Sequence, residues 1–420
     1  MERINVKNEK ALLVGVIRPN LEKDVILDHL NELELLAKTA GAIVVAKITQ
    51  KVAKINPSTF IGLGKAQQVI NQAKELRVSI IIFDDELSPA QIKNYHQKSK
   101  KIKVIDRSGL ILDIFKQNAR TKESTTQVEL AYLQYLLPRL TRQWTHLERQ
   151  MGGIGTRAGM GETQIEVDRR IVRTRINKLK NELKDIEKER RIQGLKRKSE
   201  FRVSLVGYTN AGKSTLFKAL TGSDVIVENQ LFATLDTTVR RLQIGRSHSI
   251  LLSDTVGFIR KLPHNLVASF KSTLKEVVEA DLIIKVLDVS SPHIYEHIQT
   301  INKVLNDINA SHVPAINVLN KVDLLPDANL IAKLKRTFPG MLTISAARSL
   351  KLSDLKIKIK EAIEESYETV DVKFSYRDSK LISKIQENVI VLERDYMNEY
   401  VKLKLRGSKA RINKILSMVN

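Results

Sequence analysis

One stretch of the chain combines glycines, a lysine and a serine at the spacing of a phosphate-binding loop. In FRVSLVGYTNAGKSTLFKAL the pattern GxxxxGK[ST] is formed by Gly207, Gly212, Lys213 and Ser214, after an apolar strand and before a helix. The glycines would let backbone N–H groups close around the α- and β-phosphates of a nucleotide. Lys213 would reach the β- and γ-phosphates, and the Ser214 hydroxyl would bind Mg²⁺. The predicted loop also contains Tyr208, Thr209, Asn210 and Ala211.

A second motif, DTVG, follows about 40 residues later at the end of an apolar run. Its carboxylate, Asp254, would hold the shell of the metal ion, and the amide of Gly257 would donate to the γ-phosphate. Thr255 and Val256 lie between them and are predicted to contact the nucleotide as well. The segment therefore supplies the groups that respond to the terminal phosphate.

Two further motifs are suited to a guanine base. In VLNKVD, an ionised Asp323 can accept hydrogen bonds from the N1–H and the exocyclic amine of guanine, whereas adenine would leave the carboxylate unpaired. Lys321 would cover the plane of the base, and a backbone amide of TISAA would donate to the guanine O6. All four motifs in this order predict a GTP-binding domain over residues 200–366. The remaining predicted contacts of these two motifs are Asn320, Val322, Ser345, Ala346 and Ala347.

Length and composition limit what surrounds this domain. A chain of 420 residues with 42% apolar side chains is too long for one core, so we expect two to four domains. The absence of cysteine excludes disulfides, zinc knuckles and thiol catalysis. The chain begins without an apolar signal segment and has no run of 18 apolar residues, so we expect a soluble cytoplasmic protein with no membrane span. The net charge of +23 indicates a polyanionic partner, either a nucleic acid or a lipid surface.

Residues 1–120 are predicted to form an α/β domain with a parallel sheet. Short apolar strands, among them ALLVGVI, AIVVAKI and SIIIFDD, alternate with helix-like stretches. Within this domain GLGK, residues 62–65, opens a helix whose N-terminus could receive a phosphate, for example that of ATP. A glycine turn before a helix is the simpler interpretation, and the sequence favours it.

Residues 121–199 are predicted to form a helical hairpin. Two series of apolar residues at spacings of three, four and seven are typical of helices that pack on each other. Between them, residues 151–162 are too rich in glycine to continue either helix, and Pro138 should kink or shorten the first one. The two series are Leu130, Leu133, Leu137, Leu140, Trp144 and Leu147, and Ile165, Val172, Ile176, Leu179, Leu183 and Ile186.

The hairpin is also strongly basic. Residues 101–200 contain 23 basic and 13 acidic side chains. Guanidinium groups bind phosphates and stack on splayed bases, so an arginine-bearing finger is suited to folded RNA. The alternative is a solvated spacer between domains. The arginines concerned are Arg139, Arg142, Arg149, Arg157, Arg169, Arg170, Arg173 and Arg175.

Residues 367–420 are predicted to form a small C-terminal α/β domain of βαβ-like arrangement. Val401, Leu403 and Leu405 alternate with basic residues, which indicates a half-buried strand with a basic outer face. This face could contact RNA or protein.

Several segments together resemble the HflX family of ribosome-associated GTPases. They are IFDDELSPAQ, VIDRSGLILDIFKQNARTKE, QVELAYLQYLLPRL, GGIGTRAGMGETQIEVDRR and LFATLDTTVRRL. The resemblance covers almost all of the first 350 residues. It implies a P-loop GTPase domain joined to an N-terminal α/β domain, a helical linker and a small C-terminal domain.

The resemblance also implies a function. Members of this family bind the large ribosomal subunit, through ribosomal RNA and protein, and split stalled or idle ribosomes under stress. It implies a monomer in the cytoplasm, partly on ribosomes or at the membrane periphery. Thr234 would join Ser214 on Mg²⁺ when GTP is bound, within a nucleotide-contacting segment of Phe232, Ala233, Leu235 and Asp236. Two departures from the family pattern are Thr237 in place of a proline and TRAGMG in place of TRGPGE.

The residue after Gly257 is Phe258, where typical hydrolysing GTPases have a glutamine that orients water. A phenyl ring has no group for this task, so hydrolysis must use positioning from the switches, a monovalent cation or the ribosome. We assign Lys213, Thr234 and Gly257 to catalysis. Asn210 resembles the potassium ligand of related GTPases, although it could simply brace the loop. Two other functions stay open: an RNA-remodelling ATPase centred on the N-terminal domain, and a GTP-switched assembly module that splits nothing.

Overall fold

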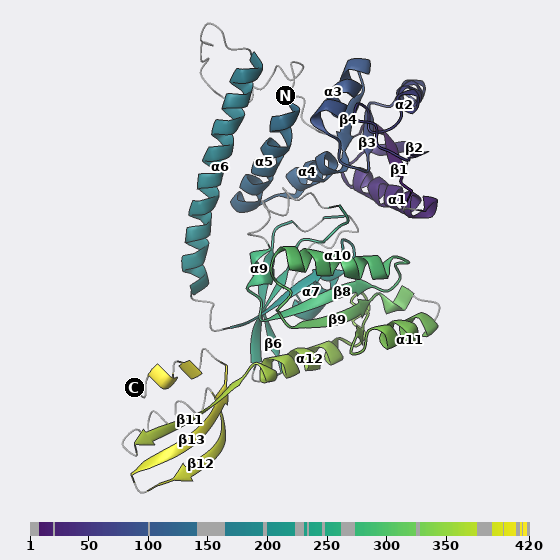
Figure 1. Ribbon diagram of the computed structural model, residues 1–420. Helices are drawn as coiled ribbons and strands as arrows, with labels where there is room; N and C mark the ends of the chain where they lie inside the picture. The colour runs from purple at the N-terminus through teal and green to yellow at the C-terminus, as the bar shows by residue number, and fades with distance from the viewer. Residues whose placement is uncertain are drawn as a thin grey trace. The chain divides into compact units, whose positions relative to one another are not determined.

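The computed structural model, drawn as a ribbon in Figure 1, describes most of the chain. The chain divides into two compact units. The first unit consists of Met1–Lys188, Ile226–Thr237 and Val256–Lys275, and the second of Glu189–Val225, Thr238–Thr255 and Glu276–Asn420. The described residues are 8–19, 22–99, 101–140, 164–195, 200–222, 231–232, 235–245, 248–261, 274–324, 328–375, 389–397, 399–408, 412–413 and 415–417.

The first unit contains a four-stranded parallel sheet in the order β2-β1-β3-β4. Strand β1 is apolar and buried along nearly its whole length, as expected of a parallel strand that is covered on both faces. The predicted parallel α/β fold is thus confirmed. Its elements are β1 (Lys10–Ile17), α1 (Lys23–Thr39), β2 (Ile43–Lys51), α2 (Leu63–Glu75), β3 (Ile80–Phe83), α3 (Pro89–Lys98) and β4 (Lys103–Asp106).

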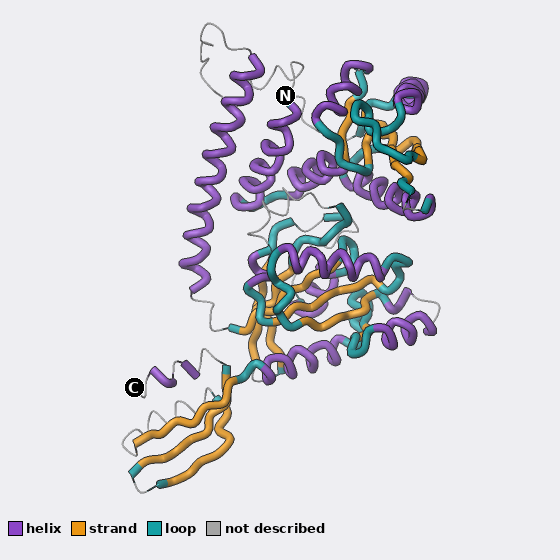
Figure 2. The backbone as a smooth tube through the Cα atoms, viewed as in Figure 1, coloured by secondary structure: helices purple, strands orange, loops and turns teal. Residues whose placement is uncertain are grey.

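Four helical elements follow β4 in the first part of the chain. They are α4 (Arg107–Asn118), α5 (Lys122–Leu136), the 3-10 turn η1 (Leu137–Arg139) and the long helix α6 (Gln164–Leu195), which are drawn as purple coils in Figure 2. Helix α5 ends before Pro138, so the proline shortens the helix and places a 3-10 turn there.

The predicted packing between the two helices is confirmed in its central part. One buried cluster joins Leu130, Leu133, Leu140, Val172, Ile176 and Leu179, with Leu137 and Leu183 packed at its edge. Trp144, Leu147 and the predicted loop 151–162 lie outside the described residues.

The second unit contains a six-stranded sheet in the order β10-β9-β8-β5-β7-β6, with β6 antiparallel to β7 and the other pairs parallel. The strand order reverses at β5, whose carboxyl end is therefore the usual place for a ligand. The elements are β5 (Phe201–Gly207), α7 (Lys213–Thr221), β6 (Thr238–Ile244), β7 (His248–Asp254), α9 (Lys275–Val278), β8 (Leu282–Asp288), α10 (Ile294–Asp307), β9 (Ala315–Asn320), η2 (Val322–Leu324), α11 (Ala328–Thr337), β10 (Leu342–Thr343) and α12 (Leu352–Glu365).

The end of the chain forms a three-stranded antiparallel sheet in the order β11-β13-β12. Its strands are β11 (Glu368–Ser375), β12 (Ile390–Tyr396) and β13 (Tyr400–Gly407). Val401, Leu403 and Leu405 are buried and alternate with half-exposed basic residues, as predicted. Strands β11 and β12 both pair antiparallel with β13 and therefore run parallel to each other. Residues 376–388, which join β11 to β12, lie outside the described residues, so the βαβ-like arrangement stays a prediction.

Two further predictions, one about membrane spans and one about domain boundaries, can be compared with the fold. None of the helices in the described ranges is both long and apolar enough to span a bilayer. The division at residues 120, 199 and 366 stays a prediction. Ile226–Thr237 and Val256–Lys275 lie within the third of these predicted domains by sequence, yet they belong to the first compact unit.

The α5–α6 packing generates a stability prediction. Leu179 is almost fully buried in the shared cluster, so Leu179→Ala should destabilise the helix pair by about 2–5 kcal/mol through lost burial and a residual cavity. Hydrogen exchange of the α5 and α6 amides measures the effect. Lys180→Ala changes an exposed neighbour on the same helix and is the control. Equal protection in both variants would contradict this packing.

Candidate nucleotide site

The loop after β5 is built on two glycines that cannot carry a side chain. A Cβ at Gly207 would overlap the carbonyl oxygen of Val286 on β8. Gly212 has φ +89°, and a Cβ there would collide with the side-chain amide of Asn320. Asn210 has a positive φ of 61° and an exposed side chain. The backbone from Gly207 to Gly212 therefore follows the course that a phosphate-binding loop needs, and α7 begins at Lys213.

Lys213 lies folded over this loop. Its ammonium group donates to the carbonyl oxygens of Gly207 (3.2 Å) and Tyr208 (3.0 Å). Burial lowers the pKa of Lys213 to about 8, although the charge of Asp254 acts in the opposite direction. Phosphate oxygens would offer this buried ammonium group stronger acceptors than the two carbonyls do.

A serine and an aspartate meet at the predicted metal corner. The Ser214 hydroxyl donates to Asp254 Oδ2 at 2.6 Å, and Asp254 is fully buried at the end of β7. Burial raises the pKa of Asp254, and its Oδ1 has no hydrogen-bond partner among the described residues. An oxygen-binding cation such as Mg²⁺ would satisfy this oxygen and favour the ionised form, so the two side chains fit the predicted metal. Thr255, next in the chain, instead donates its hydroxyl to the carbonyl oxygen of Leu205 at 2.7 Å.

Asn320 connects three motifs that are far apart in the sequence. Its amide nitrogen donates to the carbonyl oxygen of Ala211 at 2.9 Å, and its amide oxygen accepts from the backbone N–H of Ala346 at 2.9 Å. The side chain is buried. The prediction named Asn320 as a nucleotide contact. Its observed bonds fasten the phosphate loop and the segment after β10 to the end of β9.

The groups predicted to read the base lie after β9 and β10. A hydrogen bond with Ser345 lowers the pKa of Asp323, with Arg348 at 3.6 Å contributing a smaller effect. The carboxylate is therefore ionised at neutral pH, as the reading of guanine requires. Lys321 has φ 64° and its ammonium group lies 2.6 Å from Asp288 Oδ2 at the end of β8. Val322 and Ala347 lie in the same two segments, in η2 and just after Ala346.

Sequence reasoning missed several contributors to this region. Asp288 holds Lys321, and the ring of Tyr208 stacks on His297 of α10 with centroids 3.8 Å apart and planes 13° apart. The strand-end position of Asp288 in VLDVS was a signal that could have revealed it. No local pattern pairs Tyr208 with His297, because 89 residues separate them.

The predicted switch residues that the structure describes belong to the first unit. Phe232 is buried, with its ring edge-on to Phe115 at 4.7 Å, and its carbonyl oxygen accepts from Asn118 at 2.9 Å. Asp236 accepts from the Thr121 hydroxyl at 2.6 Å and from the Arg120 and Thr121 amides at 3.0 and 3.3 Å. Leu235 is buried in the same segment. Ala233 and Thr234 lie outside the described residues, so the magnesium role of Thr234 stays a prediction.

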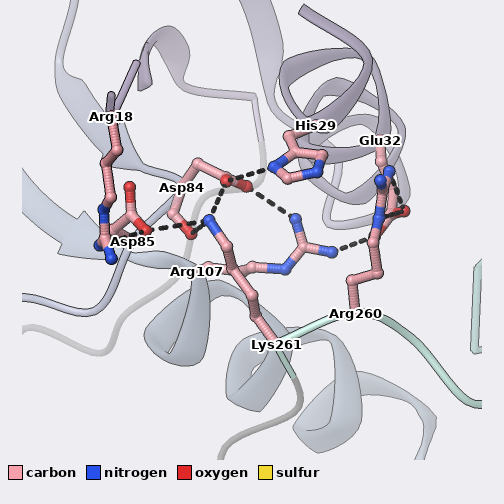
Figure 3. Close-up of polar contacts among 8 residues, drawn as sticks. All are labelled: Arg18, His29, Glu32, Asp84, Asp85, Arg107, Arg260 and Lys261. Atoms are coloured by element: carbon pink, nitrogen blue, oxygen red, sulfur yellow. Dashed lines mark hydrogen bonds and ion pairs between the residues drawn. The ribbon is translucent and has the colours of Figure 1, made fainter. Parts of the chain in front are cut away.

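The segment after Asp254 contains Phe258, whose side chain is buried. Val256 and Phe258 are buried, and Phe258 is only 2% exposed. Gly257 lies between them. The phenyl ring is thus a packing group of the first unit. Two basic residues, Arg260 and Lys261, follow and bind acidic side chains of α1 and of the β3 end (Figure 3).

The arginines predicted to contact RNA differ in their exposure and in their bonding partners. Arg139 is buried, where it donates to Asp106 and to the carbonyl oxygens of Tyr135 and Leu87, so it is not available to RNA as predicted. Arg175 binds both carboxylate oxygens of Glu129 at 2.8 Å. The described side chains of α6 that are exposed include Arg169, Arg170 and Arg173, while Arg142, Arg149 and Arg157 lie outside the described residues.

The predicted phosphate position at GLGK also has a structural role. Gly62 precedes α2, and its N–H donates to Gln50 Oε1 at 3.0 Å. This amide is therefore already bonded to β2, which favours the glycine-turn interpretation. Binding of ATP here stays an untested alternative.

Comparisons with known proteins agree with this geometry. Three family models match successive parts of the chain: a GTP-binding GTPase N-terminal region at residues 27–116, a GTP-binding GTPase middle region at 118–197, and a 50S ribosome-binding GTPase at 202–321. The chain is similar to proteins called GTPase HflX. That of Flavobacterium psychrophilum is 52% identical, with 77% of this chain and 78% of the relative covered.

Other relatives extend the similarity over nearly the whole length. The GTPase HflX of Caldanaerobacter subterraneus is 43% identical, with 96% of this chain and 92% of the relative covered. That of Escherichia coli is 41% identical, with 93% and 91% covered.

The base-reading arrangement generates a specificity prediction. Asp323→Asn should weaken GTP binding by about 2–4 kcal/mol, because the amide presents a donor where the carboxylate accepted two hydrogen bonds. It should gain affinity for xanthosine triphosphate, whose C2 oxo group can accept from the new amide. Calorimetric titration with both nucleotides measures the exchange. Asp307→Asn, on an exposed carboxylate at the end of α10, is the control. Undiminished affinity of Asp323→Asn for GTP would reject the assignment.

The lowered pKa of Lys213 generates a pH prediction. Phosphate charges should raise this pKa when nucleotide binds, so binding takes up a proton above pH 8 and the affinity for GDP falls as the pH rises from about 8 to 9. Calorimetry at pH 8.5 in two buffers of different ionisation enthalpy measures the uptake. Lys213→Arg, which stays protonated, should lose it. A proton release in the unchanged protein would contradict the burial argument.

Proposed function

We propose that this chain, which belongs to the HflX family of GTPases, binds the large ribosomal subunit and separates stalled or idle ribosomes into subunits during stress. It is a GTP-hydrolysing enzyme with a P-loop GTPase fold. The observation that best supports ribosome binding is the match of residues 202–321 to a family model, which is described as a 50S ribosome-binding GTPase. We further propose that it acts in the cytoplasm as a monomer, partly on ribosomes and in part at the membrane periphery.

Residues of the second unit are suited to hold the phosphates and their metal. The loop from Gly207 to Gly212 would present its N–H groups to the phosphates, and Lys213 would exchange its two carbonyl acceptors for phosphate oxygens. Ser214 and Asp254 would hold Mg²⁺, directly and through its shell. When bound, Mg²⁺ neutralises charge on the β- and γ-phosphate oxygens.

Unaided hydrolysis should be slow, because no side chain at position 258 can orient water. Phe258 is buried in the first unit, so its ring acts in packing. The exposed Asn210 of the phosphate loop is a suitable ligand for a potassium ion that would add positive charge beside the phosphates. We expect faster hydrolysis in potassium than in sodium, and further stimulation by large subunits.

The α5–α6 hairpin supports an RNA-binding role. Its exposed face carries Arg169 and Arg173, while Arg139 and Arg175 are bound within the protein and serve its structure. Exposed guanidinium groups on a long helix suit contacts with the phosphates of ribosomal RNA. The predicted glycine-rich tip, residues 151–162, lies outside the described residues and is the proposed point of insertion.

Sedimentation of intact ribosomes tests this function. With a non-hydrolysable GTP analogue the protein should convert 70S particles into subunits and migrate with the large subunit, whereas GDP should support neither. Replacing residues 152–161 with a short neutral linker should abolish the splitting and leave GTP affinity unchanged, because no phosphate or base ligand lies there.

The outcomes of this experiment separate the alternatives. Binding to large subunits without loss of 70S particles would indicate a GTP-switched assembly module. Splitting by the shortened protein at the original rate would show that the tip is a spacer. Nucleotide competition in which ATP displaces GTP from the splitting reaction would favour an ATPase centred on the N-terminal domain.

A further inference from the structure

The phosphate loop of the second unit contains a buried hydroxyl group, that of Thr209. This residue is the third of the loop that starts at Gly207, and it is only 7% exposed. Its Oγ1 has no hydrogen-bond partner among the described residues. Because a buried hydroxyl without a partner costs free energy, it indicates a position that a ligand or a reacting group completes. Asp254 Oδ1, at the metal corner of the same site, is unpartnered in the same way, and there the fitting ligand is a cation.

The backbone on both sides of Thr209 is held in place by other parts of the second unit. The ring of Tyr208 is buried and stacks on His297 of α10. The carbonyl oxygen of Tyr208 accepts from the N–H of Ala211 at 3.2 Å, and the carbonyl oxygen of Ala211 accepts from the Asn320 amide at 2.9 Å. The loop that carries Thr209 is therefore fixed before a nucleotide binds, which is the preorganisation that a catalytic group requires.

Lys213 shows that Thr209 lies beside the position of the terminal phosphates. The ammonium group of Lys213, which would bind the β- and γ-phosphates, donates to the Tyr208 carbonyl oxygen at 3.0 Å. This carbonyl carbon is bonded to the backbone nitrogen of Thr209, and the Cα atoms of adjacent residues are about 3.8 Å apart. Thr209 is therefore the direct neighbour of a group that contacts the phosphate-binding ammonium.

A hydroxyl group can perform both parts of the task that Phe258 cannot perform. It donates one hydrogen bond and accepts two, so it can donate to a γ-phosphate oxygen while it accepts from the attacking water. Phe258 has neither a donor nor an acceptor, and its ring is buried within the first unit. Phosphoryl transfer depends on positioning and on the stabilisation of charge, so one hydroxyl held in the right place is sufficient to affect its rate.

We propose that Thr209 is a catalytic residue of GTP hydrolysis, whose hydroxyl donates to the γ-phosphate and orients the attacking water. The water oxygen forms a bond to the γ-phosphorus while the bond from this phosphorus to the β,γ-bridging oxygen breaks, and the bridging oxygen leaves with the electron pair. One water proton stays on the attacking oxygen and the other passes to a phosphate oxygen, which gives GDP and inorganic phosphate. Thr209 keeps its own proton. The inference rests on GTP hydrolysis and not on ribosome binding, so its test contains no ribosomes.

Substitution by valine tests the hydroxyl in the full chain. Thr209→Val keeps the branched side chain and removes the donor and the acceptors. The single-turnover rate at saturating GTP should fall about 100-fold, the loss expected for one group that stabilises developing charge. The affinity for GDP, measured by calorimetry, should change less than about twofold, because GDP has no γ-phosphate. Thr209→Ser keeps the hydroxyl and should retain the rate within about threefold.

A mimic of the transferred phosphoryl group gives a second measurement. GDP with aluminium fluoride places a charged fluoride group at this position, so Thr209→Val should weaken its binding by about the same factor as the rate. Thr337→Val removes an exposed hydroxyl from α11 of the same unit and should change neither the rate nor the binding. Hydrolysis by Thr209→Val at the rate of the unchanged protein, or undiminished binding of the fluoride complex, would overturn the proposal.

A structural role for Thr209 predicts different results. If the hydroxyl only braced the loop, Thr209→Val would weaken GDP and GTP equally and leave the rate at saturation unchanged. If it acted through a cation at Asn210, the variant would lose any difference in rate between potassium and sodium, whereas a direct contact leaves that ratio as it is. Either result would overturn the proposal.

A second variant covers the case in which Thr209→Val does not fold, which a failure to bind GDP would reveal. Thr209→Ala removes the same hydroxyl with a smaller side chain, and its rate should fall as far as that expected of Thr209→Val. If Thr209→Ala binds GDP normally and hydrolyses GTP at the original rate, the hydroxyl is not catalytic.

Discussion

Buried carboxylates at the ends of parallel strands are the constraint on which both sheets depend. Parallel strands end at one edge of a sheet, so their terminal polar groups gather there and must find donors. Asp84 meets Arg107, Asp106 accepts from Tyr135 and Arg139, and Asp254 accepts from Ser214. These bonds orient the start of α4, the end of α5 and the metal corner. The same physical requirement thus produces both structural and nucleotide-binding contacts.

The sequence predicted what depends on local periodicity and on motif spacing. The parallel sheet of the first unit followed from alternating strands and helices, and the α5–α6 contact followed from the spacing of Leu130, Leu133, Val172, Ile176 and Leu179. The role of the glycines in the phosphate loop was predicted because a loop that closes around phosphates requires residues without a side chain at these positions of the motif. In each case the signal lies within a short stretch of chain or in a repeat.

Contacts between distant side chains could not be predicted in this way. From its sequence context Arg139 was predicted to be available to RNA. It is instead buried, and it donates to Asp106, which lies 33 residues away in the chain. Asp236 was predicted to contact nucleotide, yet its carboxylate binds the start of α5, 115 residues earlier. The antiparallel β12–β13 hairpin was missed because residues 397–399 carry no strong turn signal. Charge and hydropathy indicate that a residue requires a hydrogen-bond or ion-pair partner. Only the three-dimensional fold determines which side chain or backbone group is that partner.

The return of the chain to the first unit has a consequence for its synthesis. Lys261 follows its partner Asp84 by 177 residues, and at about 5–20 residues per second the ribosome needs roughly 9–35 s to make that stretch. The N-terminal sheet therefore emerges and collapses while Glu32 and Asp84 still lack two of their cations, Arg260 and Lys261. Its final, most stable form must wait until the phosphate loop and β7 have been made. The first unit is thus completed late, by pieces of the domain that follows it.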